Sequence, residues 1–386
     1  MSDVVIAGVG QLPVGEHWEI TLRNLGTQAA WAAIRDSGGL MPQAVYIGNA
    51  LAPTLSRQAN LGALLVDDAG LNGVEGVVLE AAGASGAAAA RQAYLAVSSG
   101  MIDVAMVLGV EKFTDQTGST VEAAAAQMLD SDYEAIHGLT PQSQAALLMQ
   151  RYLHDYSAPR EAFGCFAIQA HANAVNNPNA MYRRAIKLED YRAADLIGDP
   201  LNMYDAAPYA DGAAALIVAR ADRLPKDMPH PLVRISGSST VIDTLALHDR
   251  QDALAWHAAA FSVERACRQA GIMPKDVDLF EYYDAYTIFA ALSLEAAGFA
   301  KRGEGWRLAQ AGETAQGGRL PAATMGGLKA RGNPLGATGV YQLAEATLQL
   351  RGEAGACQVP NARRALVQSL GGPASTAVSH VLESWN

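Results

Sequence analysis

The chain has 386 residues, of which 50% are hydrophobic and 17% are charged. This composition is typical of a globular protein with a sizeable buried core, and it excludes a disordered chain. The formal net charge of -11 excludes nucleic acid as a principal ligand, because phosphate backbones bind to basic surfaces. A local basic patch for one phosphorylated ligand is compatible with that charge.

The compartment is predicted from the start of the chain, its hydropathy and its cysteines. The apolar residues 4–7 follow no basic segment, so they indicate a first strand and not a signal peptide. No stretch approaches the roughly 18 consecutive apolar residues of a membrane span. Cys165, Cys267 and Cys357 are widely separated, which suits a reducing compartment and indicates neither a disulfide framework nor a zinc site. We therefore expect a cytoplasmic protein without a membrane span or a metal.

The first half alternates short apolar runs with helical periodicity. We expect strands at residues 4–7, 44–47, 74–79 and 103–110, and helices at 21–37 and 87–97. Because strands and helices alternate, this pattern predicts βαβ units and an α/β fold.

An elbow between a strand and a helix organises this half. The run at 74–79 leads directly into residues 80–86, Glu-Ala-Ala-Gly-Ala-Ser-Gly, at the start of the next helix. Such an elbow directs one side chain and the first free N–H groups of the helix beyond the sheet edge, where an acyl-transfer enzyme holds its nucleophile. The tip is Gly83, which has no side chain. Taken alone, these small residues indicate close packing of helix on strand more readily than a site.

Residues 80–86, followed by 91–94 and 109–112, resemble the thiolase superfamily, most of all its archaeal-type and sterol-carrier-type acetyl-CoA acyltransferases. In those families the position that matches Gly83 holds the nucleophilic cysteine. The resemblance implies an α/β thiolase fold, in which two similar βα halves form an αβαβα layered arrangement with an inserted loop domain.

Residues 114–201 are predicted to be that loop domain, because polar turns separate helices at 143–154 and 160–173. In thiolases this insertion covers the active site and helps to hold coenzyme A. His171 resembles a residue at the helix end found there, so we assign it to substrate binding. The other interpretation is a structural hydrogen-bonding histidine.

The second half repeats the order of strand, polar elbow and helix. We expect an N-terminal half at 1–230 and a C-terminal half at 231–386. Within the latter, the pattern predicts a helix at 256–270 and a strand at 279–288 that runs into a helix at 289–297.

Two further elbows and a glycine loop match thiolase motifs with altered residues. Relatives have His-Asp-Ala-Phe or Asn-Glu-Ala-Phe where this chain has Tyr-Asp-Ala-Tyr at 283–286. Gly332 and Asn333 match the Gly-His pair of a third elbow, so Asn333 stands at the histidine position. Gly371 and Gly372 resemble the closing glycine loop, whose backbone lines the reacting carbon and so contributes to substrate binding.

This altered set disfavours ordinary thiolase turnover but retains groups that stabilise negative charge. Gly83 cannot be acylated. Its backbone N–H at a helix N-terminus favours an oxyanion, and the Asn333 amide can donate a hydrogen bond to a thioester carbonyl. Tyr283, assisted by Asp284, is the candidate for proton transfer. A phenol has an ordinary pKa near ~10, so Tyr283 would need a lowered pKa or a neighbouring acceptor to act as a base.

Three other features bear on the chemistry. Ser85 lies two residues beyond Gly83, but no histidine is placed to activate it as a nucleophile. Tyr341 is either a second proton-transfer residue or a core residue. The absence of a side chain at Gly83 predicts space for a bulky or branched β-substituent.

The sequence therefore predicts a lyase that cleaves a 3-hydroxyacyl-CoA by a retro-aldol reaction without a covalent acyl-enzyme. It resembles the thiolase-like aldolases of steroid side-chain degradation, which lack the cysteine and use a Tyr-Asp elbow. Two alternatives stay open: an acetyl-CoA acyltransferase with another nucleophile or a deliberately replaced cysteine, and a non-catalytic acyl-CoA-binding scaffold subunit. Coenzyme A is expected only as part of the substrate. The resemblance also implies a homodimer and, from several relatives, a small OB-fold partner with a zinc ribbon.

Overall fold

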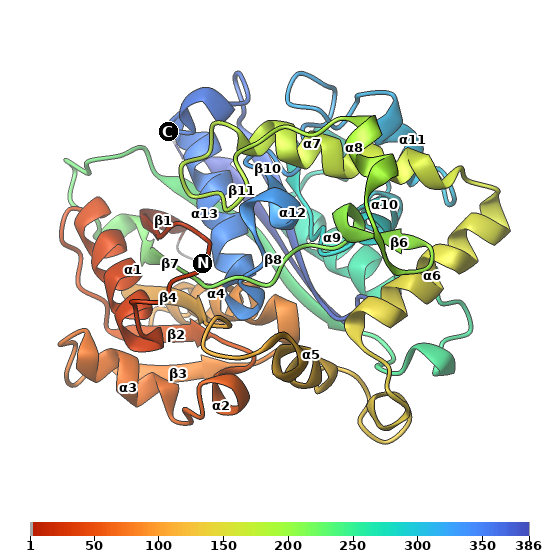
Figure 1. Ribbon diagram of the computed structural model, residues 1–386. Coiled ribbons are helices and arrows are strands. Elements are labelled where there is room, and N and C mark those ends of the chain that lie inside the picture. Colours follow the sequence, from red (N-terminus) through yellow and green to blue (C-terminus); the bar gives the residue numbers. More distant parts are fainter. Residues whose placement is uncertain (1–2, 386) are drawn as a thin grey trace.

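The structure is a computed structural model that describes residues 3–385, and it is a mixed α/β fold built on one large sheet (Figure 1). The strand order in this sheet is β3-β2-β4-β7-β1-β8-β11-β10-β9. Its strands are β1 (Val4–Gln11), β2 (Ala44–Gly48), β3 (Glu75–Leu79), β4 (Val104–Glu111), β7 (Gly212–Arg220), β8 (Val233–Ile242), β9 (Leu279–Glu281), β10 (Arg364–Gly371) and β11 (Thr376–Ser384). β5 (Leu196–Gly198) and β6 (Leu201–Asn202) pair separately.

Helices cover both faces of this sheet. They are α1 (Leu22–Asp36), α2 (Ala52–Leu55), α3 (Leu61–Asp68), α4 (Ser85–Ser98), α5 (Gly118–Ala126), α6 (Pro141–Tyr156), α7 (Gly164–Ala174), α8 (Leu188–Ala193), α9 (His257–Ala270), α10 (Thr287–Ala296), α11 (Gly305–Gln310), α12 (Gly327–Arg331) and α13 (Thr338–Arg351). Within residues 3–385, none of them combines the length and the apolar composition that crossing a bilayer requires.

The two halves of the chain share one order of elements. In the first, β1 and α1 lead to β2, and α4 precedes β4 and β7; in the second, β8 and α9 lead to β9, and α13 precedes β10 and β11. A short 3₁₀ turn precedes each equivalent helix, η1 (Ala82–Ala84) before α4 and η8 (Leu335–Ala337) before α13. The halves join where β1 pairs antiparallel with β8. This repeat confirms the prediction of two similar βα halves.

Helices α4 and α13 lie between the two halves of the sheet (Figure 1). Their apolar side chains share a core with strands of both halves. Close approach depends on small residues, because a Cβ at Gly86 of α4 would lie 2.8 Å from the Gly336 carbonyl oxygen. α1 and α3 cover the other face of the first half, and α9 and α10 cover the second. The predicted layered arrangement is therefore confirmed.

The chain between β4 and β7 forms the insertion that reaches over the second half. It carries α5 to α8 and the β5–β6 hairpin, and residues of α6 and α7 share one core with α9 and α10. The predicted loop domain, residues 114–201, lies inside this insertion. The predicted boundary at residue 230 falls in the segment that links β7 to β8.

The predicted strand at 279–288 is too long. β9 ends at Glu281, and residues 282–286 form a buried loop before α10 begins at Thr287. This loop is buried, and the Ala207 N–H from the insertion donates to the Ala285 carbonyl at 2.7 Å. A short apolar run does not distinguish such a loop from a buried strand.

Candidate active site

The first elbow is held by its own hydrogen bonds. Ala82 has φ 50°, a left-handed conformation that is uncommon for a residue with a side chain. The Ser85 hydroxyl donates to the Ala82 carbonyl at 2.7 Å and accepts from the Ala81 N–H at 2.9 Å. Ser85 is therefore engaged in the turn, as a structural residue would be. Gly83 stands in the first turn of the helical segment, where a backbone N–H has no intrahelical acceptor.

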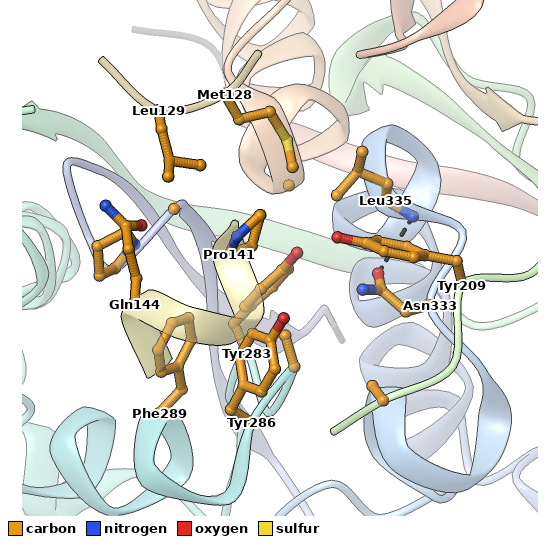
Figure 2. Close-up of a pocket in the computed structure, with 15 residues that line it drawn as sticks. Met128, Leu129, Pro141, Gln144, Tyr209, Tyr283, Tyr286, Phe289, Asn333 and Leu335 are labelled. Carbon is orange, nitrogen blue, oxygen red and sulfur yellow. Dashed lines mark hydrogen bonds between the residues drawn. The ribbon is translucent and has the colours of Figure 1, made fainter. Parts of the chain in front are cut away.

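A cavity of about 30 Å³ lies against Gly83 and is lined by residues of all three elbows, the glycine loop and the insertion (Figure 2). The lining residues are Gly83, Met128, Leu129, Pro141, Gln144, Ala207, Tyr209, Tyr283, Ala285, Tyr286, Phe289, Asn333, Leu335, Gly372 and Pro373. The topology thus brings together four of the predicted site residues, Gly83, Tyr283, Asn333 and Gly372. The volume admits about two water molecules, so an acyl chain has to displace part of this lining.

The Tyr283 hydroxyl occupies the space in which a side chain at position 83 would stand. A Cβ built on Gly83 would overlap the hydroxyl and Cζ of Tyr283, and it would lie 2.7 Å from the Leu370 carbonyl oxygen. Glycine at 83 and tyrosine at 283 are therefore sterically coupled. The predicted free space for a branched β-substituent at this point is wrong, because Tyr283 fills it.

Tyr283 is a neutral phenol at physiological pH. Burial raises its pKa well above the ordinary value, and the negative charge of Asp284 raises it further. A hydrogen bond with Asn333 and the positive charge of Arg331 oppose this shift. The lowered pKa that a free phenolate base would need is not found here. Tyr283 can therefore take up a proton only while it gives up its own.

The Asn333 side chain is fixed as a hydrogen-bond donor toward the cavity. Its Oδ1 accepts from the Leu335 N–H at 3.1 Å and from the Thr338 hydroxyl at 3.1 Å. Both donors face the oxygen, so the NH₂ group is directed toward the cavity and the Tyr283 hydroxyl (Figure 2). The Asn333 backbone N–H also donates to the Pro208 carbonyl at 2.9 Å, which ties this elbow to the insertion.

Asp284 does not line this cavity, although it follows Tyr283 in the chain. Its Oδ1 accepts from the Leu328 N–H at 2.7 Å, at the start of α12. Burial raises the pKa of the Asp284 carboxyl, and the nearby Lys329 ammonium opposes that shift. The predicted direct assistance to proton transfer is not supported by this geometry. Asp284 instead holds the second elbow against the third.

The four residues predicted to bind substrate lie in three places. Only Gly372 lines the cavity. A Cβ on Gly371 would lie 2.6 Å from the Ala81 carbonyl oxygen, so Gly371 packs against the first elbow. Gly332 has φ 106° and ends α12 against Val14, away from the cavity. Gly332 and Gly371 therefore shape the loops without facing the site.

His171, the fourth of these residues, lines a larger cleft of about 540 Å³ beside the first cavity. The cleft is lined by His171, Met181, Tyr182, Arg183, Arg184, Ile186, Ile197, Met203, Tyr204, Ala206, Ala207, Pro208 and Lys329. The two spaces meet at Ala207, which lines both. The His171 Nδ1 donates to the Arg184 carbonyl at 3.1 Å, and burial lowers the pKa of its imidazole. His171 is thus a neutral wall of the cleft.

Other candidate side chains are directed elsewhere. The Tyr341 hydroxyl donates to the Leu12 carbonyl at 2.7 Å and is buried in the core, which confirms the structural interpretation. None of the three cysteines lines the cavity. Burial raises the pKa of Cys267 and Cys357 to about 11, so both are thiols. Within the described chain the cavity contains no side chain suited to nucleophilic attack.

Tyr209 and Gln144 line the cavity but were not predicted from the sequence. Gln144 lies in α6, and Tyr209 lies in the irregular segment that returns from the insertion to β7. No periodicity marks either residue. Tyr209 lies between Pro208 and Asp211, in the segment that leads into β7.

Comparison with known proteins agrees with this architecture. Residues 4–222 match the thiolase N-terminal domain, and residues 239–384 match the thiolase C-terminal domain-like family. The chain therefore belongs to the thiolase family.

Individual relatives extend over almost the whole chain. An acetyl-CoA acetyltransferase of Methanothermobacter thermautotrophicus is 38% identical over 383 residues, which cover 99% of both chains. The benzoylsuccinyl-CoA thiolase subunit BbsB of Thauera aromatica is 29% identical and covers 96% of this chain and 94% of its own. Among solved structures, the Ltp2-ChsH2(DUF35) aldolase has a TM-score of 0.85 at 25% sequence identity, with 99% of this chain and 98% of that chain covered.

Proposed function

We propose that this protein cleaves the Cα–Cβ bond of a 3-hydroxyacyl-CoA by a retro-aldol reaction, without a covalent acyl-enzyme. The observation that carries the proposal is the Tyr283 hydroxyl in the place of a side chain at position 83. An acid-base group thus stands where an acyl-transfer enzyme needs a nucleophile. The similarity to the Ltp2-ChsH2(DUF35) aldolase supports this reaction class.

The residues of the cavity suit the charges that develop in this reaction. As the Cα–Cβ bond breaks, its electron pair forms a thioester enolate, whose oxygen accepts a hydrogen bond from the Asn333 amide. The β-hydroxyl proton passes to Tyr283, and the O–H electron pair forms the new carbonyl. The Gly83 N–H donates to that oxygen. Because Tyr283 is neutral, its own proton leaves as it receives the new one. One proton is delivered to Cα of the enolate, so the net change moves a proton from the β-oxygen to Cα.

The cleft at His171 suits the coenzyme A part of the substrate. It is mostly apolar, as a pantetheine arm requires, and it meets the Tyr283 cavity at Ala207. Arg183 and Arg184 are exposed at this cleft, and neither forms an ion pair within residues 3–385. Two free guanidinium groups can bind phosphate oxygens.

An acyltransferase is the second candidate, because the relative that is 38% identical carries the name acetyl-CoA acetyltransferase. This function would require a nucleophile other than the residue at position 83. A partner protein is a separate proposal for either activity. The aldolase relative is a complex with a DUF35 protein, and the Thauera relative is a subunit. A small OB-fold protein with a zinc ribbon would fit such a role.

Product analysis by mass spectrometry tests the proposed function. The protein is incubated with 3-hydroxyacyl-CoA and 3-ketoacyl-CoA thioesters, each with and without free CoA. We expect a 3-hydroxyacyl-CoA to give a shorter acyl-CoA and an aldehyde or ketone without free CoA. Cleavage of a 3-ketoacyl-CoA that depends on free CoA would favour the acyltransferase, and no cleavage would favour a required partner or a scaffold.

The same assay tests the cleft. N-acetylcysteamine thioesters carry the end of the pantetheine arm without the phosphates. An Arg183→Ala and Arg184→Ala double variant should raise KM about 10-fold for the CoA ester, because charge-assisted contacts are lost. It should leave the truncated ester unaffected. An equal rise for both esters would contradict this placement.

A further inference from the structure

Two of the three phenols that line the cavity take no part in the proposed cleavage by Tyr283. Tyr209, Tyr283 and Tyr286 all line the space beside Gly83. Tyr283 and Tyr286 belong to one elbow, whereas Tyr209 comes from the insertion. The backbone joins Tyr209 to the Asn333 elbow, because the Ala210 N–H donates to the Asn333 carbonyl at 3.3 Å. Tyr209 is thus held beside the amide that would bind the thioester oxygen.

The packing of Tyr209 leaves its hydroxyl directed at the cavity. Its ring stacks on Phe113 with centroids 5.0 Å apart and an interplanar angle of 19°. The ring also packs in a cluster with Val121 and Leu335. In Figure 2 the hydroxyls of Tyr209 and Tyr283 extend into the same space from different elements.

The Tyr209 hydroxyl also differs from two interior tyrosine hydroxyls that are bonded to protein. Tyr191 donates to Asp205 at 2.9 Å, and Tyr341 donates to a backbone carbonyl at 2.7 Å. Within residues 3–385, by contrast, no hydrogen bond to protein is assigned to the hydroxyl of Tyr209 or Tyr286. Tyr209 is partly buried, and its hydroxyl beside Asn333 faces the cavity without a protein partner in the described chain, so it is available to a ligand.

We propose that Tyr209 is a second catalytic residue, which protonates Cα of the enolate while Tyr283 accepts the β-hydroxyl proton. This inference rests on the proposed retro-aldol function. The Tyr209 O–H bond breaks and a Cα–H bond forms with the enolate electron pair. The proton that Tyr283 gives up then restores the Tyr209 hydroxyl. The net change moves one proton from the β-oxygen to Cα, and neither phenol stays ionised.

This relay accounts for a site whose phenols are all neutral. Burial raises the pKa of Tyr209, Tyr283 and Tyr286 alike. A single buried phenol would have to become a phenolate if it accepted a proton and gave none. Two phenols that exchange protons avoid a buried charge, which is unfavourable in an apolar site.

The test compares Tyr209→Phe with Tyr46→Phe, the same change to a phenol of β2 that does not line the cavity. Two reactions are followed, cleavage of the 3-hydroxyacyl-CoA and exchange of the Cα hydrogens of the product acyl-CoA with D₂O. We expect Tyr209→Phe to slow both about 100-fold with little change in KM, as loss of general acid-base catalysis does. Tyr46→Phe should retain both within about 3-fold.

The proposal would be overturned if Tyr209→Phe exchanged the Cα hydrogens at the wild-type rate. It would also be overturned if both variants lost the same fraction of the cleavage and exchange rates. Exchange of the Cα hydrogens with D₂O breaks no Cα–Cβ bond. It therefore tests Tyr209 even if the wild-type protein cleaves no 3-hydroxyacyl-CoA, a result that would contradict only the proposed function. Thermal unfolding of both variants checks that each is folded.

Discussion

The contact between Gly83 and Tyr283 predicts a strong coupling between two substitutions. Gly83→Ala adds a Cβ that overlaps the Tyr283 hydroxyl, and overpacking of this kind lowers the free energy of unfolding by about 1–3 kcal/mol. In a Tyr283→Ala background the same change should cost clearly less, because the two atoms nearest to the new Cβ, the hydroxyl and Cζ of Tyr283, are removed. Urea unfolding of the four proteins in the cycle measures the difference.

Gly118→Ala is the matched control for this cycle, because a Cβ there meets no atom within 4 Å. It should leave the stability within about 0.5 kcal/mol of wild type. If Gly83→Ala cost the same with and without the Tyr283 ring, the two residues would not be coupled.

The sequence predicted the members of the site better than the direction of their side chains. Gly83, Tyr283 and Asn333 were predicted because their segments resemble thiolase motifs, and the structure brings all three to one cavity. The direction of Asp284 depends on a hydrogen bond to Leu328, 44 residues away, which no local pattern encodes. The protonation of Tyr283 depends on burial by the insertion, and this also could not be predicted from its neighbours.

At the level of elements, Glu111 connects three segments that form the site. It ends β4, and its carboxylate accepts from the N–H groups of Ala50, Leu51 and Gly336 at 2.9 to 3.1 Å. The Asn49 amide is a fourth donor at 2.9 Å. Gly336 lies in the 3₁₀ turn just after Asn333 and Pro334. This buried carboxyl therefore fixes the third elbow against the first half of the sheet.

Glu111 should make the stability depend on pH. Burial raises its pKa from 4.5 to about 7, although the hydrogen bonds to it oppose the shift. Between these values the folded protein binds more protons than the unfolded chain, so the contribution of Glu111 falls as pH rises from about 4.5 to 7. The difference in unfolding free energy between wild type and Glu111→Gln should shrink over that range. A difference that grew with pH would contradict this assignment.

Helices with strong periodicity were predictable from the sequence, whereas the buried loop between β9 and α10 was not. The expected helix at 21–37 is α1, and its N-cap is the Thr21 hydroxyl, which accepts from the Asn24 N–H. Residues 282–286 are buried like a core strand, yet they form a loop, which the insertion contacts through the Ala207 N–H. Tertiary cover of this kind leaves no sign in a local pattern.

The whole molecule leaves one edge of its large sheet open. Among the described residues 3–385, β3 pairs only with β2, and its residues Val77 and Val78 are 43% and 38% exposed. An exposed apolar edge strand favours pairing with another chain. We propose that two copies of this protein associate through β3 as a homodimer.

Light scattering tests this association. Replacing Val77 and Val78 with lysine should convert a dimer into a monomer, because lysine at an edge strand opposes pairing. Met273→Lys, at an exposed apolar residue of the second half, should leave the dimer intact. A monomeric wild-type protein, or a dimer that survives both edge substitutions, would contradict the proposal.

The central claim is that a tyrosine hydroxyl replaces a nucleophile, so that turnover proceeds without acylation of the protein. Rapid-quench mass spectrometry of the intact protein, taken during cleavage of a 3-hydroxyacyl-CoA, tests it directly. The account predicts product formation with no increase in protein mass at any time point. A transient mass increase equal to an acyl group, located by peptide mapping and lost as product forms, would contradict it.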